Sequence, residues 1–271
     1  MAGTPPIVLS IAGFDPSSGA GVTADVKTIA AHGCYGLTCI TALTVQSTMG
    51  VKRVESLRAG IVAATLEELA ADSEITAVRI GMLGSGEVAE AVAAFLSKSG
   101  QRNVVLDPIL RSTSGTDLVD AAGKAVIRDR LLRLADVVTP NVDEAAELAG
   151  IPVAGLGDMS AAAARLHELG ARAVVITGGH LGETTDLLSR RTVDRDPEQT
   201  LFPGKRVESR DTHGTGCAFA TALACNLALG LALPAAVQQA KDYVAEAIVR
   251  AYPTGREAGP LNHLWNLSRK S

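Results

Sequence analysis

Residues 7–21 read Ile-Val-Leu-Ser-Ile-Ala-Gly-Phe-Asp-Pro-Ser-Ser-Gly-Ala-Gly, so an apolar run opens into a loop rich in glycine and serine. An apolar run without alternating polar residues is typical of a strand that is buried on both faces of a parallel sheet. A helix-like segment at 21–32 follows directly. We therefore predict a strand, a loop and a helix, which together form the basic unit of an α/β fold.

The same alternation of short apolar runs and amphipathic stretches continues along the chain. Further strands are predicted at 39–43, 77–82, 104–107, 136–139 and 173–177. Further helices are predicted at 59–72, 86–99, 121–134, 142–149 and 160–169. Such alternation forms right-handed βαβ units. The pattern therefore predicts a three-layer α/β fold, in which a central, mostly parallel sheet is flanked by helices on both faces.

The pattern changes after residue 185. Segments 186–191 and 199–208 are typical of antiparallel strands, and the turn between them is polar and contains a proline. Two more helices are predicted at 215–229 and 234–252. Because the sequence has no internal repeat, no linker rich in serine or proline and no low-complexity tract, we predict a single domain over residues 1–271.

Composition excludes several classes of protein. The chain has 271 residues, of which 47% are hydrophobic and 3% aromatic, and its net charge is −4. A general nucleic-acid binder usually has a basic excess or aromatic stacking platforms, so we expect no nucleic-acid partner. No apolar run approaches the roughly 20 residues that cross a membrane, and residues 1–6 have no basic region typical of a signal peptide. Four cysteines without metal-like spacing indicate a reduced, cytoplasmic protein.

The loop after the first predicted strand is the first candidate site. In open α/β sheets, ligands bind beyond the carboxyl ends of the strands. Three glycines, Gly13, Gly19 and Gly21, would let the backbone of this loop approach a ligand closely. The loop has neither the spacing of a dinucleotide-binding fingerprint nor the lysine of a P-loop. An ordinary glycine-rich turn is an equally good interpretation of this loop alone.

A second candidate site is the stretch Asp-Thr-His-Gly-Thr-Gly-Cys at 211–217, which leads into a predicted helix. Its two glycines would let successive backbone N–H groups converge at the helix N-terminus, where the helix dipole favours an anion. This arrangement suits a phosphoryl group or a developing oxyanion. The alternative is a simple helix cap by Asp211 or Thr212, but a cap does not explain the second glycine followed by a thiol.

Acidic side chains follow two further predicted strands. Asp107 stands beside a proline at a strand end, where a carboxylate is suited to hold Mg²⁺ through water. Asn141 and Glu144 are three residues apart and would share one face of the first turn of a helix. Either acid could instead cap a helix, and for Asp143 we favour that interpretation.

Taken together, these segments resemble one family in the same order from about residue 7 to 250. That family is the hydroxymethylpyrimidine/phosphomethylpyrimidine kinases of thiamine biosynthesis, within the ribokinase-like superfamily. The matching segments are 10–21, 24–28, 35–36, 41–46, 80–85, 105–108, 114–115, 139–141 with Glu144, 178–180 and 212–217. Cys217 stands where sugar kinases of the superfamily usually carry an aspartate, so it indicates the vitamin-kinase branch.

The resemblance implies a ribokinase-like fold, a homodimer, and ATP and Mg²⁺ as cofactors. It implies phosphorylation of 4-amino-5-hydroxymethyl-2-methylpyrimidine and then of its monophosphate. Carried over residue by residue, it implies a substrate pocket formed by Gly13, Asp25, Gln46 and Met82. It implies a nucleotide site at Asn141, Glu144 and Thr177, and a metal site at Asp107 and Glu144. It also implies a catalytic anion hole with a base, formed by Gly214, Thr215, Gly216 and Cys217.

Cys217 is the base that the resemblance implies. A position at a helix N-terminus lowers the pKa of a thiol, so we expect a depressed pKa at Cys217 unless the bound triphosphate reverses it. We expect Cys34, Cys39 and Cys225 to be buried and inert, and an alkylating reagent to label Cys217 first.

The sequence departs from the family pattern in three places. Thr177 occupies a position that often carries a lysine, so we expect a weaker hold on the nucleotide. Phe14 replaces a common serine, and Arg111 replaces an apolar or small residue; Arg111 could contact the substrate phosphate or simply lie at the surface. The nearest alternative function is a pyridoxal or pyridoxine kinase. A non-catalytic binding protein is disfavoured because Asp107, Glu144 and Cys217 are all present. A thiol redox protein is disfavoured because the sequence has no Cys-x-x-Cys motif.

Overall fold

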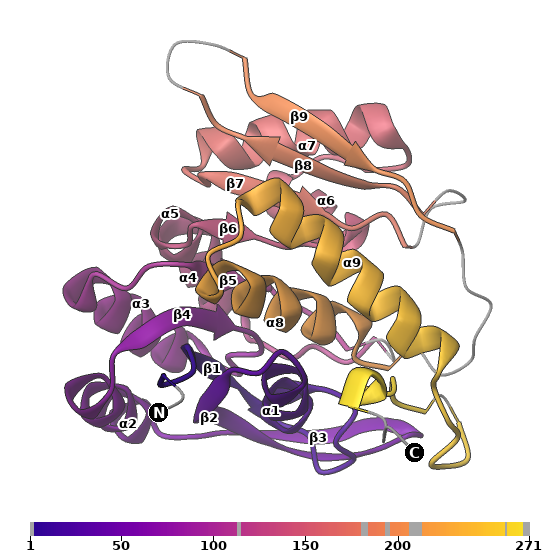
Figure 1. Cartoon of the computed structure of the whole chain (residues 1–271). Coiled ribbons are helices and arrows are strands. Elements are labelled where there is room, and N and C mark those ends of the chain that lie inside the picture. The colour runs from indigo at the N-terminus through magenta and orange to yellow at the C-terminus, as the bar shows by residue number, and fades with distance from the viewer. Residues whose placement is uncertain are drawn as a thin grey trace.

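The structure is a computed structural model that describes residues 3–112, 115–179, 184–192, 196–205, 213–257 and 259–267. Its centre is one nine-stranded sheet with the order β3-β2-β1-β4-β5-β6-β7-β8-β9 (Figure 1). The strands are β1 (Ile7–Phe14), β2 (Tyr35–Ser47), β3 (Gly50–Ser56), β4 (Ile75–Ile80), β5 (Val104–Leu106), β6 (Val137–Val138), β7 (Ala173–Ile176), β8 (Asp186–Arg190) and β9 (Glu198–Phe202).

The sheet is mostly parallel, as the sequence predicts. β1 pairs in parallel with β2 and β4, and parallel pairing continues through β5 and β6 to β7. β8 and β9 are antiparallel at one edge, and the part of their predicted range at 206–208 lies outside the described residues. β3 is antiparallel at the other edge, in a hairpin with β2 that we did not predict. Its sequence, Gly-Val-Lys-Arg-Val-Glu-Ser, is too polar to resemble a buried strand.

Helices cover both faces of the sheet and complete three layers. One face packs against α1 (Gly21–Ala31), α8 (Thr215–Ala228) and α9 (Leu233–Val249). The other packs against α2 (Ala59–Asp72), α3 (Gly86–Ser99), α6 (Val142–Ala149), α7 (Leu156–Glu168) and the segment 121–134. Neighbouring residues of β5 point to opposite faces of the sheet. Val105 belongs to the core beneath α1, α8 and α9, while Val104 and Leu106 belong to the core on the other face. This two-sided burial explains the continuous apolar runs.

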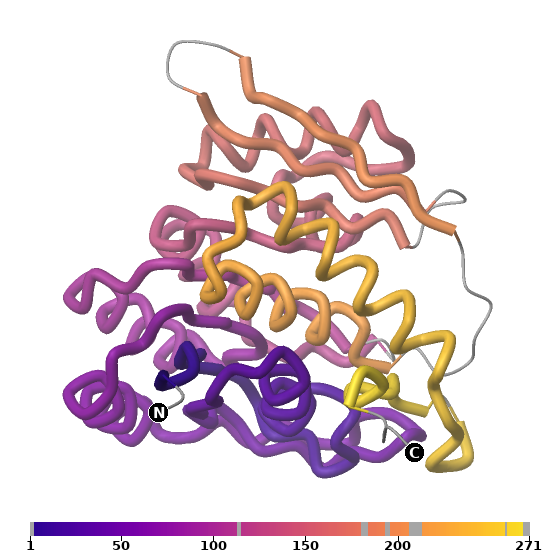
Figure 2. The backbone as a smooth tube through the Cα atoms, in the orientation of Figure 1, coloured from indigo at the N-terminus to yellow at the C-terminus, as the bar shows by residue number. Residues whose placement is uncertain are grey.

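Two further features bear on the predictions. The predicted helix at 121–134 is divided into α4 (Ala121–Val126), a π-helical turn at Ile127–Leu131, and α5 (Leu132–Leu134). The C-terminal segment returns to α1 (Figure 2). There, the Asn266 side chain donates a hydrogen bond to the carbonyl oxygen of Ala31 at 2.9 Å. Among the described residues, no helix combines the length and the apolar character that a membrane crossing requires.

Candidate active site

The two glycine-rich loops of the sequence are in direct contact. Gly214 precedes α8 with a φ of +86°, and a Cβ atom added to it would lie 1.9 Å from the carbonyl oxygen of Gly19. A Cβ on Gly19 would in turn lie 2.2 Å from Cδ2 of His213. Both positions therefore need glycine, one for its φ and both for the close approach. The structure thus brings the loop after β1 against the first turn of α8.

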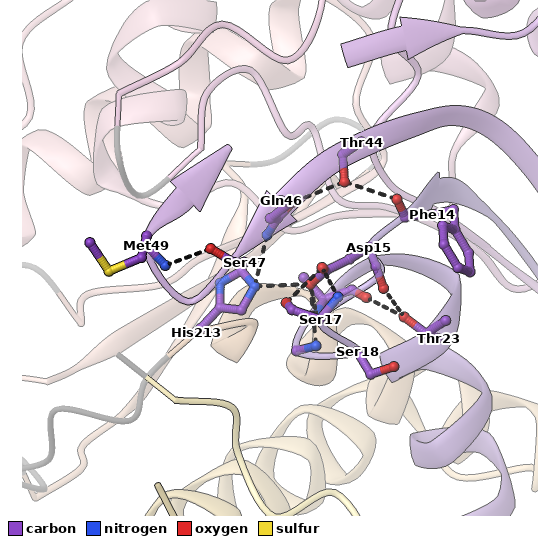
Figure 3. Close-up of polar contacts among 12 residues, drawn as sticks. Phe14, Asp15, Ser17, Ser18, Thr23, Thr44, Gln46, Ser47, Met49 and His213 are labelled. Atoms are coloured by element: carbon purple, nitrogen blue, oxygen red, sulfur yellow. Dashed lines mark hydrogen bonds and ion pairs between the residues drawn. The ribbon is translucent and has the colours of Figure 1, made fainter. Parts of the chain in front are cut away.

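Asp15 organises the loop after β1. Its carboxylate accepts hydrogen bonds from the N–H and hydroxyl of Ser17, from the N–H groups of Gly19 and Ala20, and from His213 Nε2 at 3.0 Å (Figure 3). Burial alone would raise the pKa of Asp15, but hydrogen bonds from His213 and Ser17 outweigh it and hold that pKa below its ordinary value. Sequence reasoning included Asp15 in a motif but gave it no role.

Gln46, a predicted substrate residue, lies at the edge of this loop. Its Nε2 atom is 3.0 Å from Nε2 of His213, and its Oε1 atom accepts a hydrogen bond from the hydroxyl of Thr44 (Figure 3). The contact joins β2 to the segment before α8. Gln46 therefore lies beside both glycine loops, and its pairing with a pyrimidine stays a prediction.

Gly13 and Met82, two other predicted substrate residues, are neighbours. A Cβ on Gly13 would lie 2.9 Å from Sδ of Met82, which is buried after the end of β4. Met82 also packs with Ala42 and Leu118 in a small apolar cluster. The structure therefore brings these two predicted residues together, and their contact with a flat ring stays a prediction.

A buried charge cluster lies beneath these loops. Asp25, in α1, accepts hydrogen bonds from Ser10 at 2.6 Å and Thr221 at 2.8 Å, and it forms an ion pair with Arg79 at 3.1 Å. Arg79 also pairs with Asp107, with 2.8 Å between Nη2 and Oδ2. Asp25 and Arg79 have no exposed surface. Asp25 therefore makes these contacts inside the protein, and its predicted contact with substrate stays a prediction.

Arg79 is the buried charged residue of this cluster that the sequence analysis did not single out. It lies in β4, between apolar residues, and nothing in the run 77–82 indicated that its side chain is buried among acids. The available signal was a charged residue in a strand that is otherwise suited to the sheet interior. An arginine at such a position is rarely left unpaired.

Burial controls the electrostatics of this cluster. It raises the pKa of Asp25 and Asp107 more than the Arg79 guanidinium lowers them, and the pKa of Asp107 reaches about 6. The same acids and the Cys217 thiol raise the pKa of Arg79 against its own burial. Arg79 is therefore charged at every physiological pH, while the acids beside it hold their protons more tightly than usual.

Cys217 lies in the first turn of α8 and belongs to the same cluster. The Arg79 guanidinium and the backbone of Gly21 both act to lower the pKa of its thiol. Burial nevertheless raises the pKa of Cys217 to about 12, and repulsion from Asp107 and Asp25 adds to the effect. The expected depression of this pKa is therefore wrong for this structure, because burial outweighs the helix N-terminus. The residue is a neutral thiol at pH 7.

The other cysteines are buried, as predicted. All four thiols are free, and their exposures are 8% for Cys34, 1% for Cys39, 7% for Cys217 and 0% for Cys225. Because Cys217 is no more exposed than Cys34 and has a raised pKa, the structure gives no basis for its preferential alkylation.

Arg111 is a surface residue, paired with Asp117 and Glu147.

The predicted nucleotide residues form a second group at the start of α6. Asn141 caps this helix by accepting from the N–H of Glu144 at 2.9 Å, and the Glu144 carboxylate accepts from the N–H of Asn141 at 3.0 Å. Thr177 pairs with Asn141 across a short parallel bridge. The cap is therefore Asn141, and our expectation that Asp143 caps this helix is wrong. The Asp143 side chain is exposed.

Glu144 and Asp107 are close enough to repel each other. Burial and the Asp107 carboxylate raise the pKa of Glu144 to about 8. Two buried carboxyl groups that favour protonation are a donor set that a divalent cation would fit, because it replaces the protons and supplies positive charge. No third acidic, histidine or cysteine ligand joins them within the described ranges, so water or phosphate oxygens would complete the coordination of Mg²⁺.

Four residues of the sequence motifs lie outside the described residues. They are Ser114, His180, Asp211 and Thr212. The residue directly before α8 is Gly214, which has no side chain with which to cap the helix.

Comparison with known proteins identifies the family. The family model described as phosphomethylpyrimidine kinase matches residues 15–262. The chain belongs to this family. It is 41% identical over 265 residues to the hydroxymethylpyrimidine/phosphomethylpyrimidine kinase of Streptomyces coelicolor, covering 97% of this chain and 96% of that protein. It is also 41% identical over 259 residues to the thiamine biosynthesis bifunctional protein ThiED of Geobacter sulfurreducens, covering 95% of this chain and 52%, about half, of that protein.

Solved structures confirm the ribokinase-like fold. The phosphomethylpyrimidine kinase of Clostridium difficile matches with a TM-score of 0.79 and 35% identity, over 90% of this chain and 99% of that one. The pyridoxal kinase of Bacillus subtilis, solved as an ADP complex, matches with a TM-score of 0.86 and 30% identity, over 96% and 98%. This phosphomethylpyrimidine kinase family member is therefore a kinase, and its family resemblance and fold class are confirmed.

Proposed function

We propose that this chain transfers the γ-phosphoryl group of ATP to 4-amino-5-hydroxymethyl-2-methylpyrimidine and then to the resulting monophosphate, as a step of thiamine biosynthesis. The observation that carries the proposal is the contact of Gly19 with Gly214, which places the loop after β1 against the helix that bears Cys217. The family match from 15 to 262 supplies the substrate class.

The proposed pyrimidine site lies beside the contact between the two loops. Gly13 and Met82 would form its apolar wall, and Gln46 would offer donors and an acceptor to a ring nitrogen and the exocyclic amine. Asp25 would support the pocket through its bonds to α8 and β4. Because Gln46 contacts His213 in this structure, substrate binding would exchange that contact for one to the pyrimidine.

The proposed transfer centre is the first turn of α8. Phosphoryl transfer proceeds through a loose transition state, so the protein mainly positions the groups and stabilises charge. The backbone N–H groups from Gly214 to Cys217 lie at the positive end of the helix dipole, where a transferring phosphoryl group would be stabilised. The thiol of Cys217, as thiolate, would accept the proton of the attacking group.

The proposed nucleotide site is the start of α6. Asn141 and Thr177 would contact ATP, and Asp107 with Glu144 would hold Mg²⁺. The bound metal would neutralise charge on the triphosphate. Thr177 provides no cation, so these acids and their metal would carry more of the binding.

A pyridoxal or pyridoxine kinase is the alternative, because the fold is also similar to that of a pyridoxal kinase, with a TM-score of 0.86. An assay with Mg-ATP and equal concentrations of the pyrimidine alcohol, pyridoxine and a sugar separates these functions. We expect pyrimidine mono- and diphosphates as the main products, identified by mass. Turnover of pyridoxine alone, or of the sugar alone, would overturn the proposed function.

We also propose that the chain is one ribokinase-like domain, acts in the cytoplasm and forms a homodimer. The continuous nine-stranded sheet supports one domain, and the four free thiols agree with a reducing compartment. The exposed side of the β2–β3 hairpin carries Leu43, Val45 and Met49, whose exposures of 45%, 56% and 60% suit an apolar contact with a second copy.

A further inference from the structure

One guanidinium joins two acids that come from different elements of the fold. Arg79 is in β4, and it forms ion pairs with Asp25 in α1 and with Asp107 directly after β5. Asp25 in turn accepts a hydrogen bond from the hydroxyl of Thr221 in α8, and that hydroxyl lies 2.7 Å from the backbone carbonyl oxygen of Cys217. These contacts connect different halves of the proposed reaction. Cys217 is the proposed base for the acceptor, and Asp107 is a proposed ligand for the metal that binds the nucleotide.

The local backbone makes room for this side chain. A Cβ atom on Gly81 would lie 1.9 Å from Nη1 of Arg79, so the guanidinium rests against the backbone of its own strand's end. Arg79 has no exposed surface and is held by two ion pairs, so it cannot move away into solvent. Position 81 in the Ile-Gly-Met-Leu segment at 80–83 therefore requires a glycine, because a side chain there would occupy the space of the Arg79 guanidinium.

We propose that Arg79 is a positioning residue for phosphoryl transfer, which fixes the Cys217 thiol relative to the Asp107 carboxylate. The planar guanidinium offers several donors in a fixed geometry, whereas a lysine ammonium at the same place cannot span the same partners. Arg79 acts through these residues and contacts no substrate. The proposal rests on the proposed function, which supplies the role of Cys217, the role of Asp107 and the identity of the substrate.

Misplacement of a reacting group by about 1 Å can cost about 100-fold in rate. We therefore expect Arg79→Lys, which keeps the charge, to lower kcat by about 100-fold and to change the KM of the pyrimidine alcohol less than about threefold. Gly81→Ala keeps every charged group and displaces the guanidinium, so we expect it to lower kcat in the same way. Matched controls are Arg165→Lys, at an exposed ion pair with Glu168, and Gly60→Ala, where an added Cβ meets no atom within 4 Å.

The test combines steady-state kinetics with crystal structures of the two variants at Arg79 and Gly81. We expect the separation of the Cys217 Sγ and Asp107 Oδ2 atoms to change by about 1 Å in each. Wild-type kcat in both variants, an unchanged separation, or a KM that rises as kcat falls would overturn the proposal. If the wild-type protein does not phosphorylate the pyrimidine, the proposed function fails, and the structures still decide the positioning role.

Discussion

Replacing Cys217 with alanine is expected to lower kcat for the pyrimidine alcohol by about 10²–10⁴-fold, which is the usual contribution of a general base. The thiol lies in the first turn of α8 and is buried. The substitution removes one buried sulfur atom and keeps the backbone N–H groups of the anion hole. The measurement is kcat and KM at saturating Mg-ATP, with the melting temperature as a control for folding.

The pH dependence separates a base from a packing residue. Burial raises the pKa of Cys217 to about 12, so only a small fraction of thiolate exists at neutral pH. That fraction grows about tenfold per pH unit below the pKa, and kcat should rise with pH wherever the thiolate limits the rate. Cys217→Ala should lose this slope. An undiminished kcat in the variant, or the same dependence of kcat on pH as in the wild type, would show that Cys217 is not the base.

Gly214→Ala is expected to abolish most activity, with a fall in kcat/KM of more than about 100-fold. A Cβ there would lie 1.9 Å from the carbonyl oxygen of Gly19, and a φ of +86° is strained for alanine. Because the obstructing atom belongs to the backbone, the two loops must separate. We expect a lower melting temperature as well.

Gly157→Ala is the matched control for this prediction. Gly157 lies in the first turn of α7, outside both glycine loops, is exposed, and an added Cβ meets no atom within 4 Å. We expect kcat/KM within a few-fold of the wild type, and equal losses in the two variants would show that contact between the loops is not what activity requires.

Much of the fold follows from local sequence patterns. The bounds of α2, α3 and α6 agree with the predicted ranges, and the side chains of Ser85 and Asn141 cap the starts of α3 and α6. β3 was missed because its half-exposed, polar strand lacks the continuous apolar run that marked the others. The break of the 121–134 helix into two helices and a π-helical turn was also missed, since periodicity alone does not mark such a turn.

The candidate site was predictable only in part. Both glycine loops follow from their motifs, and the rule that ligands bind at the carboxyl ends of strands places them together. The burial of Cys217 and the pairing of Arg79 with two acids depend on residues distant in sequence. Neither the raised pKa of the thiol nor the role of Arg79 could therefore be read from a local motif.

A phosphorus NMR time course of the purified protein with Mg-ATP and the pyrimidine alcohol tests the central claim most directly. We predict that a pyrimidine monophosphate signal rises first and then falls as a diphosphate appears. Two molecules of ADP should form for each pyrimidine consumed, and chelation of Mg²⁺ should stop both steps. Release of inorganic phosphate without any pyrimidine phosphate, or a monophosphate that accumulates and is never consumed, would contradict the account.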